Sequence, residues 1–252
     1  MDRRTKEYKL RKENKMTPEQ EKFYDIKNTS DYQIVGEDID YKVFVDNEKK
    51  EVVLQFKESD SREDWKHNFQ FLPWPLKLTG NGIKLGTKGA KDKGKIVWTT
   101  RGYACAYKST QGKPVQELLE EAAHHLDYKI CIRGWSFGSA MAKIAARHII
   151  SFFKGIKLAY TKNEQQYYID ELTTYGDVKC WANPFYSAKK DCRRIREYVT
   201  ANDLVTWAVP FYRRDVKCKV GPRFSICRLL QTEYNHTHYE EYDYSKYEGD
   251  EE

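Results

Sequence analysis

The sequence predicts an α/β fold in which a mainly parallel central sheet is covered by helices on both faces. Apolar stretches with the alternation of strands are separated by segments with helical spacing, which is typical of parallel strands joined by crossover helices. One junction, Lys129–Ala146, joins such a strand to such a helix through Gly-Trp-Ser-Phe-Gly at 134–138. In that context a Gly-x-Ser-x-Gly turn lifts the serine hydroxyl clear of the sheet and leaves the next backbone N–H free.

The length and composition favour one globular domain. The chain has 252 residues, of which 40% are hydrophobic and 33% charged. We expect the domain at 31–242, between a charged helical extension at 1–30 and an acidic tail at 243–252. No run approaches the ~20 apolar residues of a membrane span. The charged N-terminus also lacks the apolar centre of a secretory signal, so we expect a cytoplasmic protein.

The charge and the cysteine content limit the binding partners, metals and cofactors that we expect. The net charge is +6, although from Thr232 onward eight acids face one lysine, so the rest of the chain is more basic than the total suggests. No nucleic-acid-binding motif accompanies this basic surface, and we expect no nucleic-acid partner. The six cysteines form no C-x-x-C pair, and no His/Cys cluster has zinc spacing. We therefore expect reduced thiols, no metal site and no cofactor.

The first elements are a helix and a hairpin. The helix begins after Thr17, with a proline at its first position, and the hairpin covers Ile39–Phe56 with its turn at Asp46–Lys50. The next segment, Phe56–Pro73, starts as a polar loop and continues with apolar residues at helical spacing. By periodicity alone this segment predicts a surface helix with an apolar underside.

The middle of the chain leads to the serine junction. Leu76–Lys95 is rich in glycine and lysine but has neither a Walker motif nor a dinucleotide fingerprint, so we expect a flexible or hairpin insertion. Ile96–Tyr107 predicts a strand followed by a short helix. Pro114–Leu126 predicts a helix, with proline at its first position and one apolar face.

The C-terminal third is expected to complete the sheet. Thr173–Trp181 predicts a core strand, Ala188–Arg194 a helix, and Ile195–Val205 a strand that runs into a polar loop. Val216–Leu230 predicts a hairpin around Gly221-Pro222. Two histidines follow this last predicted pair of strands.

Three residues suited to nucleophilic catalysis each follow a predicted strand. They are Ser136, Asp203 and a late histidine, His236 or His238. In open α/β sheets, sites form at the carboxyl ends of the strands. The order Ser…Asp…His is that of the α/β-hydrolases, in which the histidine activates the serine and the acid orients the histidine.

Taken together, these pieces resemble the class 3 lipases, a branch of the α/β-hydrolase fold, over roughly Val52–Tyr242. The shared features, in chain order, are an oxyanion loop after a strand, an acid-tryptophan pair, a glycine-aromatic segment before a helix, the serine turn, a strand with a glycine, the loop with the acid, and a histidine before paired glutamates. The matching residues are Phe56-Lys57-Glu58-Ser59, Asp64-Trp65, Arg101-Gly102-Tyr103, Gly134–Ser139, Thr174–Val178, Val199–Val205 with Pro210, and His238–Tyr242.

The resemblance implies a role for each matched position. Ser136 would be the nucleophile, Asp203 the orienting acid, and a late histidine the base; His238 is preferred from its Glu-Glu-Tyr context, with His236 as the alternative. The backbone N–H groups of Phe137 and Ser59 would form the oxyanion hole, with the Ser59 hydroxyl as a further donor. Residues 60–71 would form the lid. Residues implied in lid or acyl-chain contact are Trp65, Phe69, Phe71 and Trp135.

The resemblance implies a hydrolase of carboxylic esters, of lipids or phospholipids, working through an acyl-enzyme. The basic surface suits contact with an anionic membrane. The chain departs from the family pattern where Lys57-Glu58 replaces Arg-Gly and where Trp135 replaces the histidine before the nucleophile. The altered oxyanion loop and the lysine-rich insertion at 76–95 motivate an alternative from another class, a catalytically weak or silent scaffold used for binding or assembly. Short, lysine- and tyrosine-rich chains of this kind also resemble lipase-like proteins encoded by large phages.

Overall fold

A seven-stranded sheet forms the centre of the computed structural model, which describes residues 16–28, 30–36, 39–58, 70–78, 95–156, 169–182, 192–207, 218–225 and 230–245. The strand order is β1-β2-β3-β6-β7-β8-β9. The bounds are β1 (Gln33–Val35), β2 (Ile39–Asp46), β3 (Glu51–Phe56), β6 (Lys129–Trp135), β7 (Ile169–Tyr175), β8 (Cys192–Thr200) and β9 (Cys218–Val220).

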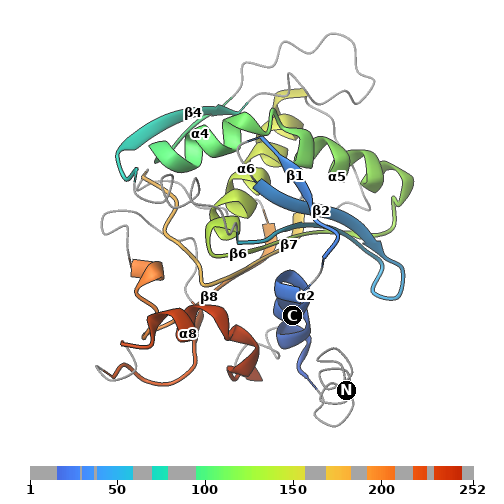
Figure 1. Ribbon diagram of the computed structural model, residues 1–252. Coiled ribbons are helices and arrows are strands. Elements are labelled where there is room, and N and C mark those ends of the chain that lie inside the picture. The colour runs from blue at the N-terminus through green and yellow to red at the C-terminus, as the bar shows by residue number, and fades with distance from the viewer. Residues whose placement is uncertain are drawn as a thin grey trace.

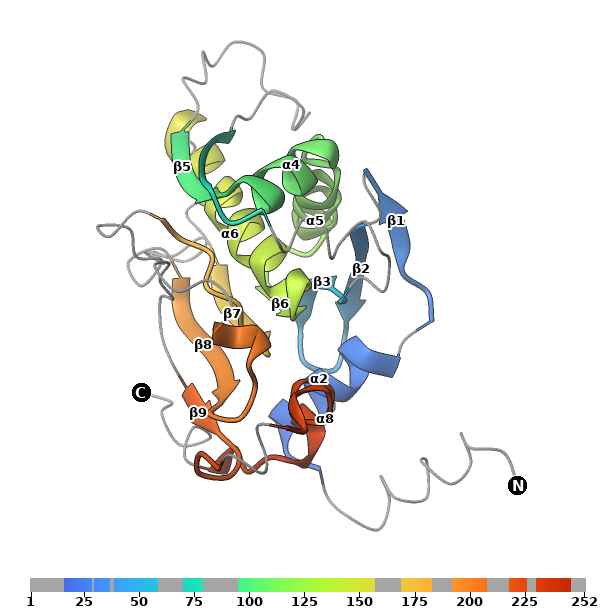
Figure 2. The same cartoon turned by 60° about the vertical axis from the view of Figure 1, so that its left-hand side comes forward.

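Strands β3, β6, β7, β8 and β9 pair in parallel, whereas β1, β2 and β3 pair antiparallel. Helices α4 (Arg101–Ser109), α5 (Lys113–His124) and α6 (Phe137–Ile156) lie on one side of this sheet. Helices α2 (Pro18–Asn28) and α8 (Thr232–Thr237) lie on the other (Figures 1 and 2). The predicted α/β architecture, with a mainly parallel sheet and helices on both faces, is therefore confirmed.

The alternation of side chains along the strands separates two cores. On β6, Ile130 and Ile132 point toward α4, α5 and α6, where they join a cluster of aliphatic and small residues that we call the main core. Farther along β6, Arg133 and Trp135 point to the opposite face, toward α2. There the second core consists of Phe23, Ile26, Trp135, Tyr175, Tyr198, Cys218, Val220, Tyr239, Tyr242 and Tyr244.

Several predicted elements agree with the structure. The hairpin at 39–56 is formed by β2 and β3, with Val43 opposite Leu54. Helix α2 begins at Pro18, and the Thr17 side chain and backbone exchange hydrogen bonds with Gln20 in a capping box. Helix α5 begins one residue before the predicted proline, after Gly112 in the left-handed region at φ 77°.

Three boundaries predicted near the C-terminus are wrong. Strand β7 begins at Ile169 and ends at Tyr175, earlier than predicted, because its charged Glu171 is buried in ion pairs and hides the apolar pattern. Strand β8 begins at Cys192, within the segment predicted as helix. Strand β9 pairs in parallel with β8, so the described part of the predicted hairpin at 216–230 is instead the edge of the main sheet.

The tail also differs from the expected domain limits. Tyr244 is fully buried in the second core and donates a hydrogen bond to the Tyr239 carbonyl, so the folded body continues past the predicted boundary at 242. Helix α2, expected as an extension, packs into the same core through Phe23 and Ile26.

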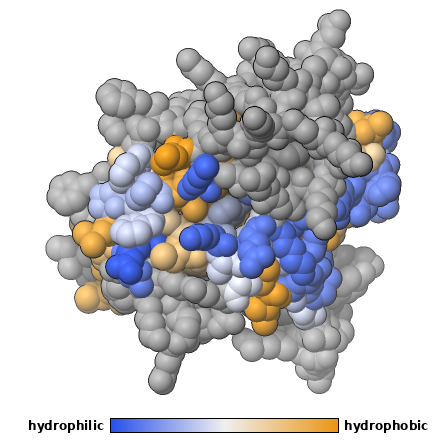
Figure 3. Space-filling view, turned by 90° about the horizontal axis from the view of Figure 1, so that it is seen from above, coloured by the Kyte–Doolittle hydropathy of each residue, from blue (hydrophilic) through white to orange (hydrophobic). Residues whose placement is uncertain are grey.

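A separate ribbon of two antiparallel strands, β4 (Pro73–Leu78) and β5 (Lys95–Thr100), lies on the main-core side. Among the described residues, no helix combines the length and apolar character needed to cross a membrane. Seen from above, the described surface is largely polar, with apolar residues in separate places between the polar ones (Figure 3).

Candidate active site

The serine turn lies between β6 and α6, as the sequence predicts. Ser136 has a φ of 54°, in the left-handed region that non-glycine residues rarely adopt. Its N–H donates to the Tyr175 carbonyl of the neighbouring strand (3.0 Å), and its own carbonyl accepts from the Ser139 N–H (2.9 Å). A strained backbone held from both sides in this way is typical of a nucleophile elbow.

The two glycines of the pentapeptide permit close packing around this turn. A Cβ on Gly134 would lie 2.3 Å from the Gly138 carbonyl oxygen, and a Cβ on Gly138 would lie 2.6 Å from the Lys57 carbonyl oxygen. Any side chain at either position would force the start of α6 away from the sheet. The glycines therefore bring Lys57, at the end of β3, next to the serine turn.

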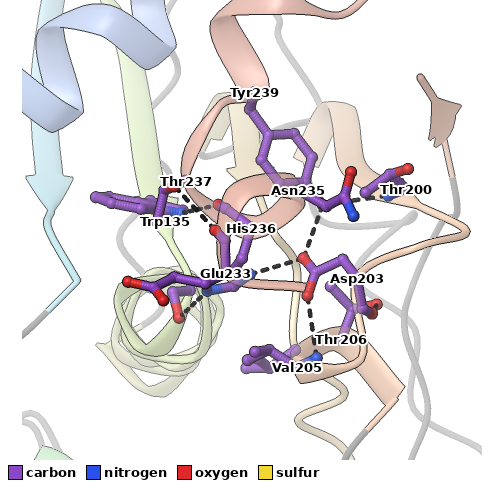
Figure 4. Close-up of polar contacts among 12 residues, drawn as sticks. Trp135, Thr200, Asp203, Val205, Thr206, Glu233, Asn235, His236, Thr237 and Tyr239 are labelled. Atoms are coloured by element: carbon purple, nitrogen blue, oxygen red, sulfur yellow. Dashed lines mark hydrogen bonds and ion pairs between the residues drawn. The ribbon is translucent and has the colours of Figure 1, made fainter. Parts of the chain in front are cut away.

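The structure brings Ser136, His236 and Asp203 together. The Ser136 Oγ lies 2.6 Å from the His236 Nε2. The His236 Nδ1 lies 2.7 Å from the Asp203 Oδ2 (Figure 4). All three side chains are buried, with exposed fractions of 3%, 4% and 0%. This is the hydrogen-bonded chain in which a histidine can take the serine proton and an aspartate can stabilise the imidazolium.

Asp203 is held by the loop after β8 and by a tyrosine. Its Oδ1 accepts from the Val205 N–H (3.0 Å), and its Oδ2 accepts from the Tyr239 hydroxyl (3.2 Å), in addition to its contact with the imidazole (Figure 4). The Tyr239 hydroxyl in turn accepts from the Thr200 N–H at the end of β8 (3.1 Å). The buried carboxylate therefore has fixed hydrogen-bond donors on both of its oxygens.

His236 enters the site from α8 and is positioned by two further contacts. The Trp135 indole N–H donates to the His236 carbonyl (3.1 Å), so the residue before the nucleophile holds the backbone of the base. Gly176, at φ 52° after β7, provides space for the ring. A Cβ there would lie 2.8 Å from the His236 Cε1.

Electrostatics raise the pKa of His236. Burial lowers this pKa, but the attraction and hydrogen bond of Asp203, together with the Glu58 carboxylate, outweigh burial and leave it above the ordinary histidine value. Glu58 Oε1 lies 3.8 Å from the His236 Nε2. This carboxylate occupies the position at which the resembled family has the glycine of its oxyanion loop.

His238, the preferred base of the sequence analysis, lies elsewhere. Its ring stacks on Tyr234 with 3.9 Å between centroids, and its Nδ1 lies 3.0 Å from the Tyr234 carbonyl and 2.9 Å from the Thr237 Oγ1. The geometry therefore corrects the preference in favour of His236. Two residues along a helical turn point about 200° apart, so only one of the two histidines can face the serine.

The remaining candidate residues are placed less fully. Ser59, Trp65 and Phe69 lie outside the described residues. Phe71 is half-buried in the stretch 70–72, whose carbonyls accept from the first N–H groups of α4. Trp135 differs from its expected role as a wall of the acyl site, because it is 95% buried in the second core.

Phe137 is the first residue of the 20-residue helix α6, directly after the nucleophile. Backbone N–H groups in the first turn of a helix have no intrahelical partner and carry partial positive charge. The Phe137 ring packs edge-on against Tyr103 of α4, at 5.7 Å, which fixes this turn in the main core. In the described part of the chain, no cluster of histidine, cysteine or acidic residues could hold a metal ion.

A buried ion pair that was not among the predicted site residues supports the loop after β7. Lys143 of α6 is fully buried, and its ammonium lies 2.8 Å from Asp177 Oδ1 and donates to the Val178 carbonyl (2.7 Å). Burial lowers the pKa of Lys143, but the Asp177 and Glu197 carboxylates raise it above the ordinary lysine value. This pair fixes the loop that contains Gly176. The available signal was Lys143 among the alanines and isoleucines at the start of this helix.

Comparison with known proteins places the chain among lipases. Residues 53–212 match the family model described as Lipase (class 3), a span that contains Ser136 and Asp203 and ends before His236. A fungal lipase–inhibitor complex is 19% identical, with 73% of this chain and 60% of that chain covered and a TM-score of 0.51. Another fungal lipase is 17% identical, with coverages of 79% and 64% and a TM-score of 0.50.

A mutant form of MDLA from Penicillium cyclopium is 21% identical, with 77% of this chain and 62% of that chain covered and a TM-score of 0.49. This chain spans about three fifths of the length of these solved proteins. The likeness to the two fungal lipases with TM-scores of 0.51 and 0.50 shows the fold. A search of curated protein sequences finds no significant match.

Proposed function

Because the chain belongs to the class 3 lipase family, we propose that it is a serine hydrolase that cleaves carboxylic esters with Ser136, His236 and Asp203. The observation that supports this assignment is the continuous chain of contacts from the Ser136 hydroxyl through the His236 ring to the Asp203 carboxylate, at 2.6 and 2.7 Å. Each contact lies within the range over which a proton is transferred or a ring is oriented.

The reaction follows from these positions. The Ser136 oxygen attacks the ester carbonyl carbon while its proton passes to the His236 Nε2, and the Asp203 carboxylate stabilises the resulting imidazolium. The carbonyl oxygen becomes an oxyanion that accepts from the Phe137 N–H and, by resemblance, from Ser59. The imidazolium then protonates the departing alkoxide. In the second half of the reaction His236 takes a proton from water, and the hydroxyl attacks the carbonyl carbon of the acyl-enzyme. The bond from this carbon to the Ser136 oxygen then breaks, the His236 imidazolium returns the proton to that oxygen, and the carboxylic acid leaves.

We propose a lipid or phospholipid ester as the substrate. The family supports this class, and the outer side of the β4–β5 ribbon offers a surface that suits a lipid interface. On this side Ile96 and Trp98 are exposed, at 59% and 44%, and the register places Lys77 opposite Ile96. Trp74, 45% exposed, lies near the end of the ribbon on its other face, in line with the buried Leu76 and Leu78. The Arg101 guanidinium lies 5.3 Å from the centre of the Trp74 ring. Tryptophan beside cationic side chains is typical of proteins at membrane surfaces, where anionic headgroups attract the cations.

The membrane contact can be tested by co-sedimentation with vesicles of phosphatidylglycerol or of phosphatidylcholine. We expect stronger binding to the anionic vesicles, and Trp98→Ser should weaken it. Trp207→Ser removes an equally exposed tryptophan outside the ribbon and serves as the matched control. Equal binding by the two variants would assign the contact to another surface.

The hydrolase itself is tested with a fluorophosphonate probe, which reacts only with an activated serine. We expect labelling of the purified protein, no labelling of Ser136→Ala, and a large loss in His236→Ala. His238→Ala is the matched control, because it removes the neighbouring histidine that stacks on Tyr234. Absence of labelling in the folded wild-type protein would contradict the proposal and favour a silent scaffold. Loss of labelling in His238→Ala alone would make that residue the base.

A further inference from the structure

Helix α2 is fixed to the sheet by one of its faces. The Glu19 carboxylate lies 3.0 Å from the Arg196 guanidinium of β8, and the Lys22 ammonium lies 2.7 Å from the Glu171 carboxylate of β7. The Tyr175 hydroxyl donates to the Glu19 carbonyl (2.8 Å). These groups are almost completely buried, so α2 is an integral layer of the protein.

A second face of α2 contacts the segment that carries His236. The Gln20 side-chain N–H donates to the Tyr242 carbonyl (3.3 Å), and the Lys27 ammonium lies 3.0 Å from the Glu240 carboxylate and also donates to the Thr237 carbonyl. Residues 20, 23 and 27 form one stripe, because positions three and four apart lie on the same side of a helix. Figure 2 shows α2 beside α8, although more than 200 residues separate them in the chain.

Phe23 lies at the centre of this stripe and touches the supports of the triad. Its ring packs edge-on against Trp135, with 5.4 Å between centroids, and tilted against Tyr239, at 5.7 Å, and it is fully buried. Trp135 holds the His236 carbonyl, and Tyr239 holds the Asp203 carboxylate. One side chain of α2 therefore packs on both groups that orient the base and the acid.

We infer that α2 is a positioning element of the active site, with Phe23 as the positioning residue that keeps Trp135 and Tyr239 where they hold His236 against Asp203 and Ser136. This inference rests on the proposed function for its catalytic consequence. The residues that match the family model, 53–212, include neither α2 nor α8. The base of this chain is therefore held by an arrangement that the family match does not describe.

A purely structural role for α2 predicts a different outcome. If α2 only stabilised the fold, a variant such as Phe23→Ala would unfold at a lower temperature, but its folded fraction would keep the normal site. If α2 positions the triad, the folded protein itself has a displaced histidine. Misplacement of a catalytic group by about 1 Å can reduce a rate about 100-fold.

The first measurement is the pKa of His236, obtained from an NMR titration of protein with labelled histidine. The His236 signal is assigned by its absence in His236→Asn. In the wild-type protein we expect a value above the ordinary one. In Phe23→Ala it should move back toward the ordinary value, because the ring loses both its burial and its contact with Asp203. Phe23→Leu, which keeps an apolar side chain, should restore most of the shift. Leu118→Ala in the main core is the control for lost packing, and its His236 should keep the raised pKa of the wild-type protein.

The second measurement is the rate of fluorophosphonate labelling at saturating probe, below each variant's unfolding temperature. We expect about a 10- to 100-fold loss in Phe23→Ala and little loss in Leu118→Ala. If Phe23→Ala does not fold, Lys27→Met gives a milder form of the same change. Its control is Lys49→Met, since Lys49 forms an ion pair with Glu21 on another part of α2 (4.0 Å).

The two measurements separate the two proposals. If folded Phe23→Ala and Lys27→Met keep the wild-type His236 pKa and the wild-type labelling rate, the positioning role is overturned while the hydrolase proposal stands. Equal pKa shifts in the control variants would also overturn it. A shifted pKa in Phe23→Ala, in a protein whose wild-type form is never labelled, would support the positioning role and contradict the hydrolase.

Discussion

The two cores on opposite faces of the sheet differ in composition and in what they support. The main core is mostly aliphatic, with residues such as Ile132, Leu118 and Ile149 packed between the sheet and three helices. The second core is mostly aromatic and lies beside buried ion pairs such as Lys22–Glu171. The nucleophile turn is anchored in the main core through α6 and Phe137, whereas the base is held by the second core through Trp135.

This difference shows two ways of fixing a catalytic side chain. Ser136 is positioned by the local backbone, because it lies in the tight turn that joins β6 directly to α6. His236 is positioned by side chains from distant segments, since α8 has only six residues and cannot fix its own orientation. Aromatic rings and tyrosine hydroxyls suit this task, because they combine large buried area with a directed hydrogen bond.

The largest expected effect is the loss of turnover in a variant of Asp203, the acid that binds the His236 ring. Asp203→Asn should preserve the fold but leave the imidazole in the wrong tautomer, because the Nδ1–H then has no carboxylate to bind. We expect turnover to fall by about 10⁴-fold, by analogy with other serine hydrolase triads. Ester hydrolysis of the variant, with circular dichroism as the test of folding, checks this. Near-normal turnover would remove Asp203 from the triad.

A smaller effect is expected from filling the space next to the base. In Gly176→Ala, the added methyl group would lie 2.8 Å from the His236 ring and would strain a backbone with φ 52°. We expect about a 100-fold loss of turnover, since the ring must move away from Ser136. Gly221→Ala is a comparable control, because it also has a positive φ (75°) but approaches Tyr242 instead of the base. Equal losses in both variants would indicate a general effect of strain.

The sequence predicted the main-core half of the protein better than the second-core half. The hairpin at 39–56 and the helix near 114–126 have local signals, namely alternation, a turn and a proline at a helix start. The strand–turn–helix around Ser136 also follows from local pattern. The pentapeptide glycines are explained by close backbone approach, which is a short-range requirement.

The second core depends on contacts that no local pattern contains. Glu171 interrupts the apolar pattern of β7 because its partner, Lys22, comes from α2. The choice between His236 and His238 depends on Trp135 and Gly176, which are at least 60 residues away in the chain. The neighbours along the chain favour His238, whereas the fold places His236 opposite Ser136. The tail is visibly rich in tyrosine, but the sequence does not indicate which tyrosine hydroxyl binds Asp203.

The buried ion pairs of the second core should make its stability depend on pH. Burial raises the pKa of Glu171, but the attraction of Lys22 and Arg133 outweighs burial and lowers this pKa to about 2, from an ordinary value of 4.5. A depressed pKa stabilises the fold above the unfolded-state pKa, and this contribution is lost as the pH falls from 4.5 toward 2. Glu171→Gln should therefore destabilise the protein at pH 7, by on the order of 3 kcal/mol.

Thermal or urea unfolding at neutral and acidic pH tests this dependence. The difference between Glu171→Gln and the wild-type protein should shrink as the pH falls through the region below 4.5. Asp127→Asn is the control, because its pair with Lys50 is exposed and such pairs contribute only about 0–1 kcal/mol. A pH-independent difference for Glu171→Gln would mean that packing, and not charge, explains its effect.

The smallest expected effect is a shift of pH dependence at Glu58, the carboxylate 3.8 Å from the His236 Nε2. The base must be neutral to accept the Ser136 proton, so activity falls as the pH drops through the His236 pKa, which lies above the ordinary value. Glu58→Gln removes one of the charges that raise this pKa, while the stronger partner, Asp203, remains. The acid limb of the pH–rate profile should therefore move to lower pH. Glu241→Gln, in the same segment as the base but hydrogen-bonded to Tyr234, should leave it unchanged. An unmoved limb in Glu58→Gln would mean that Asp203 alone sets the protonation of the base.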